Sequence, residues 1–375
     1  MQTRKNLLSA ALLAAVVLPG VAQAQAVDFT WYGRIDLALE NNNDGTLNRT
    51  LVQNFSSRLG IKGERKFGAD LSGIFQVETG VAPDDSGNSS PFANRNSYLG
   101  VKSASAGTML VGTHDMPFKS LEGTAYGLWG EGDFQEIFIN GKATASTVGS
   151  SFGNLHTRQK NVLLYTSPKL MNTVVAKLAY SPDEAKTAAV PASATVAATP
   201  AIAKPMLGTS VEYNDGTWNV GLATQSQQNF GATVATSLTS TAATLGHTLK
   251  GSKLTLGAKI NAWTAGLAMS KLDNNNGAKS TNLLVTGAYA LDSAITLKAS
   301  LGKAGESAAG KDDGTRGLAL EGDFALDKQT TAYLYYASLS NATNGKARFE
   351  ASDSKFTPAA GKDPRALGVG VRYNF

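Results

Sequence analysis

The chain has 375 residues, no cysteine and a formal net charge of +5. Without cysteine it can form neither a disulfide nor a thiolate metal site. Removal of Arg4 and Lys5 with an N-terminal segment would take away two positive charges and leave +3, which gives no reason to expect nucleic-acid binding. The mean hydropathy of −0.13 suits a soluble protein, but a membrane β-barrel has a similar average because its strands alternate apolar and polar residues.

The N-terminal segment has the features of an export signal. Arg4 and Lys5 precede an apolar run from Leu7 to Leu18, which is too short to cross a bilayer as a helix. The run is followed by Ala22-Gln23-Ala24, a small-x-small cleavage pattern, and Ala24-Gln25-Ala26 is a second possible cleavage site. We therefore predict a signal peptide at residues 1–24 and one mature domain at residues 25–375.

The mature chain begins with a long alternating segment, Val27–Glu40. Its odd-numbered positions are apolar or glycine, and most even-numbered positions are polar or charged. A period of two is the side-chain period of a β-strand. A strand with one apolar and one charged face fits lipid outside and water inside a barrel. Shorter segments repeat the pattern: Arg58–Glu64, Lys253–Ala262, Ala294–Gly302 and Leu367–Phe375.

Short and long polar connections alternate along the chain, which is typical of an antiparallel barrel with short turns on one rim and long loops on the other. The short connections are predicted at Lys66–Asp70, Ser103–Ala106, Asn214–Gly216, Gly251–Ser252, Asp292–Ser293 and Asp327–Lys328. The long connections are predicted at Pro83–Pro91, Pro117–Thr157, Pro182–Pro205, Gln227–Ser240, Asp273–Lys279, Ala304–Asp313 and Asn341–Pro364. The count indicates about sixteen strands, enough to leave an aqueous lumen.

Two of the long connections differ in character. Ala185–Pro205 is rich in alanine, proline and threonine with little to bury, so we expect a surface loop. Phe118–Thr157 mixes aromatic and acidic residues, and a loop of that length is usually functional or disordered. Its aromatic residues favour packing, which a loop folded into the barrel would find.

Several of these segments, in this order and spacing, resemble the trimeric general-diffusion porins of Gram-negative outer membranes, in their beta-proteobacterial, neisserial-type branch. The segments that carry the resemblance are Val27–Asp36, Ser57–Glu64, Leu71–Glu78, Arg95–Val101, Gly107–Gly112, Asn161–Pro168 and Gly368–Phe375. The resemblance implies a sixteen-stranded homotrimeric barrel whose third loop, at about residues 117–157, folds inward. It also implies an assembly signal at the last strand, with Tyr373 and Phe375 as its aromatic residues.

The resemblance further implies a constriction with arginines on the wall and acids on the third loop. The matching wall positions are Arg34, Arg58, Arg95 and Arg158, and the candidate loop acids are Glu131, Asp133 and Glu136. Strand periodicity adds Lys62, Lys259 and Lys298 to the basic residues expected to face the lumen. Many family members carry an arginine just after the glycine of the fifth strand, where this chain has Thr113 and His114, and this departure predicts a softer anion preference.

The function expected from these patterns is passive diffusion of small hydrophilic solutes and ions across the outer membrane, with a modest preference for anions. The expected partners are two further copies of the chain, outer-membrane lipid and lipopolysaccharide, and the barrel assembly machinery. A substrate-specific channel is one alternative, since Tyr333, Tyr335 and Tyr336 could form an aromatic track, although an aromatic girdle at the membrane boundary explains them more simply. A structural or adhesive barrel without an open pore is another.

Catalysis finds little support in the sequence. The chain has three histidines, His114, His156 and His247, and none has HExxH spacing or a nucleophile-elbow context. We expect no enzyme activity, no cofactor and no metal.

Overall fold

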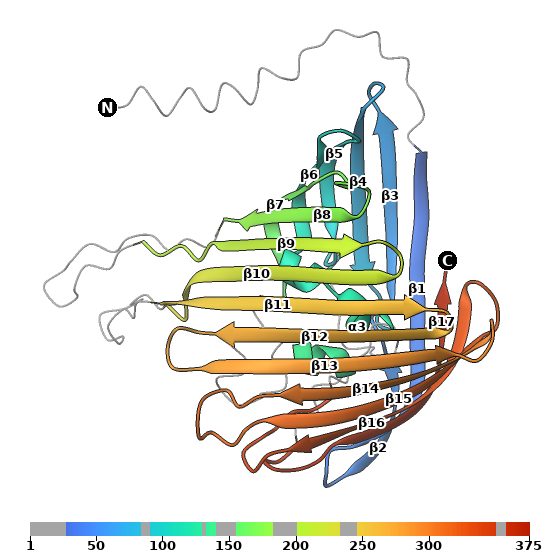
Figure 1. The fold of residues 1–375 in the computed structure, drawn as a ribbon, viewed down its shortest axis with the longest axis vertical. Helices are drawn as coiled ribbons and strands as arrows, with labels where there is room; N and C mark the ends of the chain where they lie inside the picture. Colours follow the sequence, from blue (N-terminus) through green and yellow to red (C-terminus); the bar gives the residue numbers. More distant parts are fainter. Residues whose placement is uncertain are drawn as a thin grey trace, which may run out of the picture.

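The computed structural model describes residues 28–83, 91–129, 133–139, 155–182, 201–232, 246–349 and 358–375. The described strands form one sheet that closes on itself, with three short helices inside it (Figure 1). The strands are β1 (Asp28–Asn43), β2 (Asn48–Asn54), β3 (Arg58–Lys66), β4 (Leu71–Gly80), β5 (Ser97–Ser103), β6 (Gly107–Asp115), β7 (Arg158–Thr166), β8 (Val174–Ser181), β9 (Met206–Asn214), β10 (Trp218–Phe230), β11 (His247–Ile260), β12 (Trp263–Asp273), β13 (Lys279–Ala290), β14 (Ile295–Ala304), β15 (Thr315–Ala325), β16 (Thr330–Asn341) and β17 (Arg365–Asn374). The helices are α2 (Pro117–Ser120), α3 (Gly123–Gly127) and α4 (Asp133–Ile139).

Every neighbouring pair of strands is antiparallel, and β1 closes the ring by pairing with β17. On its other side β1 pairs with both β2 and β3. These two are halves of one barrel strand, interrupted at residues 55–57, where Ser56 has a φ of 57°. Counted in this way, the seventeen elements make sixteen barrel strands, which confirms the predicted barrel and its strand number.

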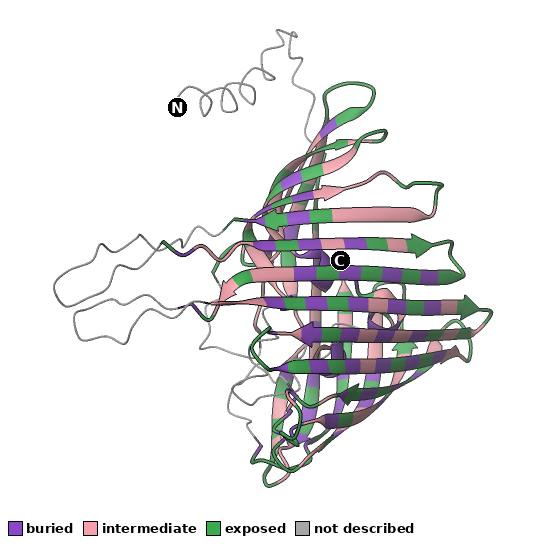
Figure 2. Cartoon of the chain, turned by 60° about the vertical axis from the view of Figure 1, so that its left-hand side comes forward, coloured by how far each residue is buried: buried purple, intermediate pink, exposed green. Residues whose placement is uncertain are grey.

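Burial alternates along most strands, which distinguishes the two faces of the sheet (Figure 2). In β17 Leu367 and Val369 are 53% and 55% exposed, whereas Gly368 and Gly370, which follow them in turn, are buried. The exposed apolar positions form the outer, lipid-facing surface, and the intervening positions face the lumen. The predicted faces of the first strand hold: Trp31 and Leu39 are exposed and Asp36 and Glu40 are buried inside.

Short turns join the strands at one rim and longer segments join them at the other. The predicted turn at Gly251–Ser252 is wrong, because both residues lie within β11. The chain instead turns at Asn261 and Ala262, where Asn261 has a φ of 54°. Asparagine is one of the few residues other than glycine that adopt this left-handed conformation at low cost.

Several predictions fall on residues that the structure does not describe. The proposed signal peptide at residues 1–24 and most of the Ala185–Pro205 loop lie outside the described ranges. Among the residues that are described, no helix combines the length and the apolar character needed to span a bilayer.

Candidate functional site

The third long connection carries α2, α3 and α4, and each helix is tied to the inner face of the barrel by a hydrogen bond from a strand side chain. The Lys253 ammonium on β11 donates to the carbonyl oxygens of Phe118 at 2.6 Å and Leu121 at 3.4 Å. The Thr286 hydroxyl on β13 donates to the Ala125 carbonyl at 2.9 Å. Together these bonds hold α2 and α3 against the wall.

The third helix is held in the same way. Ser270 on β12 donates its hydroxyl to the carbonyl of Ile139, at 2.9 Å, at the end of α4. Phe134 and Phe138 of α4 are buried and pack against each other with ring centroids 4.9 Å apart. The described part of the loop therefore lies inside the barrel, on the side formed by β9–β15.

Lumen-facing glycines let this loop approach the wall closely. A Cβ atom on Gly266 of β12 would lie 2.3 Å from the backbone nitrogen of Ala125, and one on Gly302 of β14 would lie 2.2 Å from the Phe138 ring. Any larger residue at either position would occupy the same space as the loop. These glycines therefore belong to the wall surface against which the third loop packs, and no phosphate-binding role is needed to account for them.

The predicted basic wall occupies the inner face of β1, β3 and β7 and the segment before β5. Arg34 and Arg58 are directly opposite each other on β1 and β3. The Arg95 guanidinium lies 2.6 Å from a carboxylate oxygen of Glu78 on β4, and Arg58 lies 4.0 Å from the other oxygen of the same carboxylate. The Tyr32 hydroxyl also donates to Glu78, at 2.9 Å. Glu78 thus holds the side chains of two arginines and a tyrosine in one cluster.

Arg158 makes a separate ion pair on the same wall. Its guanidinium lies 3.1 Å from Asp115 at the end of β6 and donates to the Asn96 side chain at 2.9 Å. Arg34, farther along the wall, donates from Nε to the Asn374 side chain at 2.9 Å. Each of the four arginine side chains therefore has a defined partner and a fixed orientation.

Glu78 and Asp115 carry the main ion pairs of the basic wall, and neither was among the site residues predicted from the sequence. Glu78 could have been found, because it shares its strand face with Gln76 and Ser72, whose positions alternate with the apolar positions of β4. Asp115 carries no comparable signal, since it is the last residue of its strand.

The predicted lysines have different surroundings. Lys62 has its ammonium 5.1 Å from the centre of the Tyr32 ring and belongs to the basic wall. Lys298 also faces inward, but it is buried and lies 2.9 Å from Glu321 and 2.6 Å from Asp323, so its charge is already paired. Lys259 lies at an inward position of β11 and is exposed.

Of the three predicted loop acids, the structure describes the side chain of Glu136. It is half-buried and accepts a hydrogen bond from the Tyr126 hydroxyl at 3.1 Å. Asp133 begins α4, but its side chain is not described, and Glu131 lies outside the described residues. The opposition of loop acids and wall arginines therefore stays a prediction.

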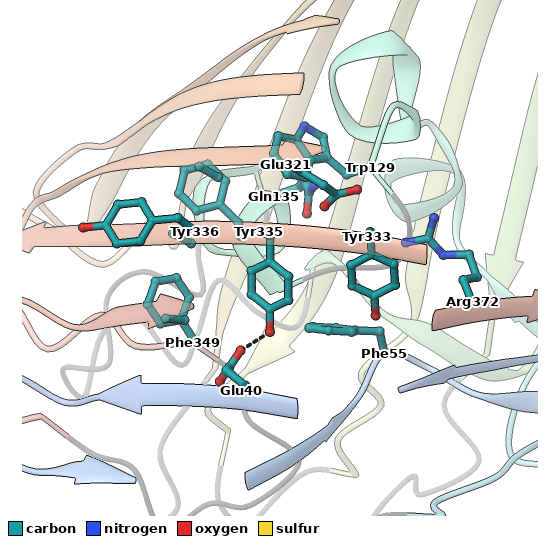
Figure 3. A pocket seen from close by; sticks show the side chains of 14 residues that line it. Glu40, Phe55, Trp129, Gln135, Glu321, Tyr333, Tyr335, Tyr336, Phe349 and Arg372 are labelled. Atoms are coloured by element: carbon teal, nitrogen blue, oxygen red, sulfur yellow. Dashed lines mark hydrogen bonds between the residues drawn. The ribbon is translucent and has the colours of Figure 1, made fainter. Parts of the chain in front are cut away.

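A second polar cluster joins β1 to β16 and β17, next to the basic wall (Figure 3). The Tyr333 hydroxyl donates to Asp36 at 2.5 Å, and the Arg372 guanidinium lies 2.7 Å from the same carboxylate. The Tyr335 hydroxyl donates to Glu40. The predicted girdle position is thus wrong for Tyr333 and Tyr335, which point into the barrel.

This cluster lines a small cavity of about 50 Å³ between the wall and the loop residues Trp129, Phe134 and Gln135. A cavity that holds benzene has about 150 Å³, so this one has room for one or two waters and not for a solute. The inner aromatic residues therefore fill the space between loop and wall, and they do not form an aromatic track for a solute.

The two ends of the barrel sheet meet at the rim with the short turns. The Gly33 N–H donates to the Phe375 carbonyl at 2.9 Å, and the Phe375 N–H donates to the Gly33 carbonyl at 3.1 Å. The rings of Tyr373 and Phe375 stack with centroids 5.7 Å apart, and both are exposed on the outer face with Trp31. Closure of the last strand against the first is as expected, whereas a role in assembly stays a proposal.

Comparison with known proteins adds the family. A model of the Gram-negative porin family matches residues 9–344. The major outer membrane protein P.IB of Neisseria gonorrhoeae is 26% identical over 131 residues, which are 32% of this chain and 36% of that protein. The P.IB protein of Neisseria lactamica is 26% identical over 166 residues, covering 42% of this chain and 45% of that protein. These alignments span less than half the length of the curated relatives.

Solved structures agree in fold over the whole barrel. The anion-selective porin from Comamonas acidovorans superposes with a TM-score of 0.72 at 17% identity, covering 93% of this chain and all of that one. OmpT of Vibrio cholerae in its trimer form gives a TM-score of 0.63 at 17% identity and covers 94% and 100%. At such identities the likeness shows the fold alone. Because the family model covers most of the chain, and the closed barrel agrees with it, the chain belongs to the Gram-negative porin family of outer-membrane β-barrels.

Proposed function

We propose that the chain forms a water-filled channel for passive diffusion of small hydrophilic solutes and ions, and that it has no enzymatic role. A barrel of sixteen strands is too wide for wall side chains to fill, and in this chain the third loop takes up one side of the interior. The observation that carries the proposal is the wall opposite that loop, where four oriented arginines and Lys62 face the remaining space. A polar, charged passage of this kind suits hydrated solutes and disfavours apolar ones.

The same wall supports a modest preference for anions. The four arginines and Lys62 group with two carboxylates, those of Glu78 and Asp115. The proposed loop acids, Glu131, Asp133 and Glu136, would oppose this excess of three charges, and Glu136, which is half-buried beside Tyr126, would contribute least. The net field at the constriction is then weakly positive, and dissolved salt screens it, since the Debye length falls from about 10 Å at 0.1 M to about 3 Å at 1 M.

The test is the reversal potential of single channels in a planar bilayer, measured in a dilute gradient of a salt whose ions have similar mobility. Arg58→Ser should shift the reversal potential in the direction of greater cation preference. Glu78→Gln should shift it in the direction of greater anion preference, because it removes one negative charge from the same cluster. Lys328→Ser, in the exposed turn before β16, is the matched control and should shift neither way. A strong cation preference of the unmodified channel would contradict the proposal, as would shifts of equal sign in the first two variants.

The proposal includes a homotrimer in the outer membrane, reached after removal of residues 1–24 and insertion by the barrel assembly machinery. Tyr373 and Phe375 are its proposed assembly signal. The trimer form of the V. cholerae OmpT structure supports the oligomeric state through the shared fold. Migration as a heat-modifiable trimer on gels would support this, and a folded monomer in native membranes would contradict it.

A further inference from the structure

His114 lies on the inner face of the barrel, close to the end of β6. The outward positions of this strand are occupied by Met109 and Val111, which are exposed on the outer face. The imidazole packs against the ring of Tyr98 on β5, with ring centroids 5.5 Å apart. Tyr98 points inward, since Leu99 beside it is 70% exposed on the outer face. The imidazole therefore belongs to the same inner wall as the four arginines.

The two ring nitrogens of His114 have different surroundings. Nδ1 lies 2.8 Å from the backbone carbonyl oxygen of Asp115, so this nitrogen carries a proton and donates it in a hydrogen bond. Nε2 is then the nitrogen that gains or loses a proton. In the described part of the structure Nε2 has no hydrogen-bond partner, and it is not enclosed, in contrast to Nε2 of His247, which is buried. Water in the lumen therefore reaches the nitrogen that titrates.

Charged groups from three strands surround the imidazole. Asp115 of β6, Arg158 of β7 and Lys177 of β8 interact with it electrostatically, and Tyr98 is the titratable group on β5. Asp115 and Arg158 neutralise each other in an ion pair at 3.1 Å. Lys177 makes no ion pair with any residue that the structure describes, and it donates to a hydroxyl of α2 at 3.4 Å. Protonation of the imidazole thus adds a second positive charge to that of Lys177.

A single added charge has a large effect when opposing charges nearly balance. The basic wall has a small positive excess, and the proposed acids of the third loop oppose it, so one charge is a large fraction of what remains. Histidine is the side chain whose charge ordinarily changes between about pH 5 and 8. Arginine, lysine and carboxylate side chains at their reference values keep their charge through that range. The imidazole is therefore the group whose charge follows the pH of the lumen.

We infer that His114 determines how strongly the channel prefers anions, because its imidazole adds a positive charge to the basic wall when the lumen is acidic and loses that charge when the lumen is neutral. The softer anion preference predicted at Thr113 and His114 is then a property of neutral solution, and acid strengthens the preference. The inference rests on the proposed channel and its basic wall. It does not depend on the sign of the preference, since the added charge favours anions from any starting value.

The test is the reversal potential of the channel in a planar bilayer, measured in a dilute gradient of potassium chloride from about pH 8 to about pH 4.5. Reversal potentials report selectivity whatever number of channels is open, so closure of channels by acid does not enter. His114→Asn keeps an amide donor for the Asp115 carbonyl and removes the titrating nitrogen. Its ratio of anion to cation permeability should equal that of the unmodified channel at the alkaline end. At the acidic end it should be about two- to fivefold lower, since a unit charge about 8 Å from a passing ion attracts an anion and repels a cation.

Two further variants complete the test. His247→Asn is the matched control, because His247 lies at the start of β11 and packs against Phe230, and it should respond to pH as the unmodified channel does. His114→Lys carries a fixed charge and should hold the higher permeability ratio from neutral to acidic pH.

Equal responses to pH in the unmodified channel and in His114→Asn would overturn the inference, as would an equal loss of response in His247→Asn. If His114→Asn does not assemble, His114→Lys serves, and a response to pH as large as that of the unmodified channel would overturn the inference. A cation preference at every pH would contradict the proposed anion preference alone, while acid separating His114→Asn from the unmodified channel would still uphold the role of His114.

Discussion

The close packing of the third loop against the barrel wall predicts the effect of adding a single methyl group to that wall. In Gly266→Ala the new Cβ atom would lie 2.3 Å from the Ala125 nitrogen, whereas ordinary contacts begin at 3.4 Å. Helix α3 must therefore retreat by the difference, about 1.1 Å, and the direction open to it is the lumen. Overpacking of this kind costs about 1–3 kcal/mol, and the Thr286–Ala125 hydrogen bond would lengthen with it.

Single-channel conductance and urea unfolding in detergent measure the two consequences. We expect Gly266→Ala to lower the conductance and to reduce the free energy of unfolding by about 1–3 kcal/mol. The matched control is Gly287→Ala on β13, which is exposed on the outer face with nothing within 4 Å of the new Cβ atom. If Gly266→Ala and Gly287→Ala gave equal conductance and equal stability, the loop would not rest on this wall and the reasoning would be refuted.

Two further predictions concern the turn rim. Deletion of Phe375 removes both backbone hydrogen bonds to Gly33 and should sharply reduce folded trimer in the outer membrane, while Phe375→Tyr should assemble; normal heat-modifiable trimer from the deletion would contradict this. Hydrogen bonds from the Ser103 and Ser105 hydroxyls lower the pKa of Asp70 from 3.8 to about 2. Because the folded value is the lower one, the carboxylate's contribution to stability is complete above its unfolded pKa and is lost as the pH falls through the folded value. Hydrogen-exchange protection of the Ala104 amide, which donates to Asp70, should persist at pH 4 and fall near pH 2, and a loss already at pH 4 would count against the assignment.

The barrel could be predicted because lipid on one side and water on the other impose alternation on every strand. The mistaken turn at Gly251–Ser252 shows the limit of that pattern. A glycine followed by serine resembles a turn, but Gly251 faces the lumen, and a Cβ atom there would lie 2.9 Å from Leu155 of the third loop. The glycine makes room for a segment about a hundred residues earlier in the chain, which local turn chemistry does not reveal.

The positions of the basic residues in the candidate site could be predicted from the sequence, but their ion-pair partners could not. The four arginines lie on the inner wall. Glu78 of β4 contacts Arg58 of the neighbouring strand β3 and Arg95 of the segment before β5. Such pairs depend on strand register, which a single sequence does not supply. Tyr333 and Tyr335 were placed in a girdle by their residue type, although Leu334 between them, 58% exposed, is the residue of that segment that faces lipid.

The bonds between Gly33 and Phe375 join the two strands of the sheet that are most distant in sequence. Their strands, β1 and β17, are the first and the last strands of the described sheet, so this edge of β1 has no partner until the strands between them have been synthesised. Contacts this distant in sequence form slowly, and an open strand edge is a template for pairing with other chains. The unclosed chain is therefore the state most open to pairing with other chains, and closure of β17 against β1 ends that exposure.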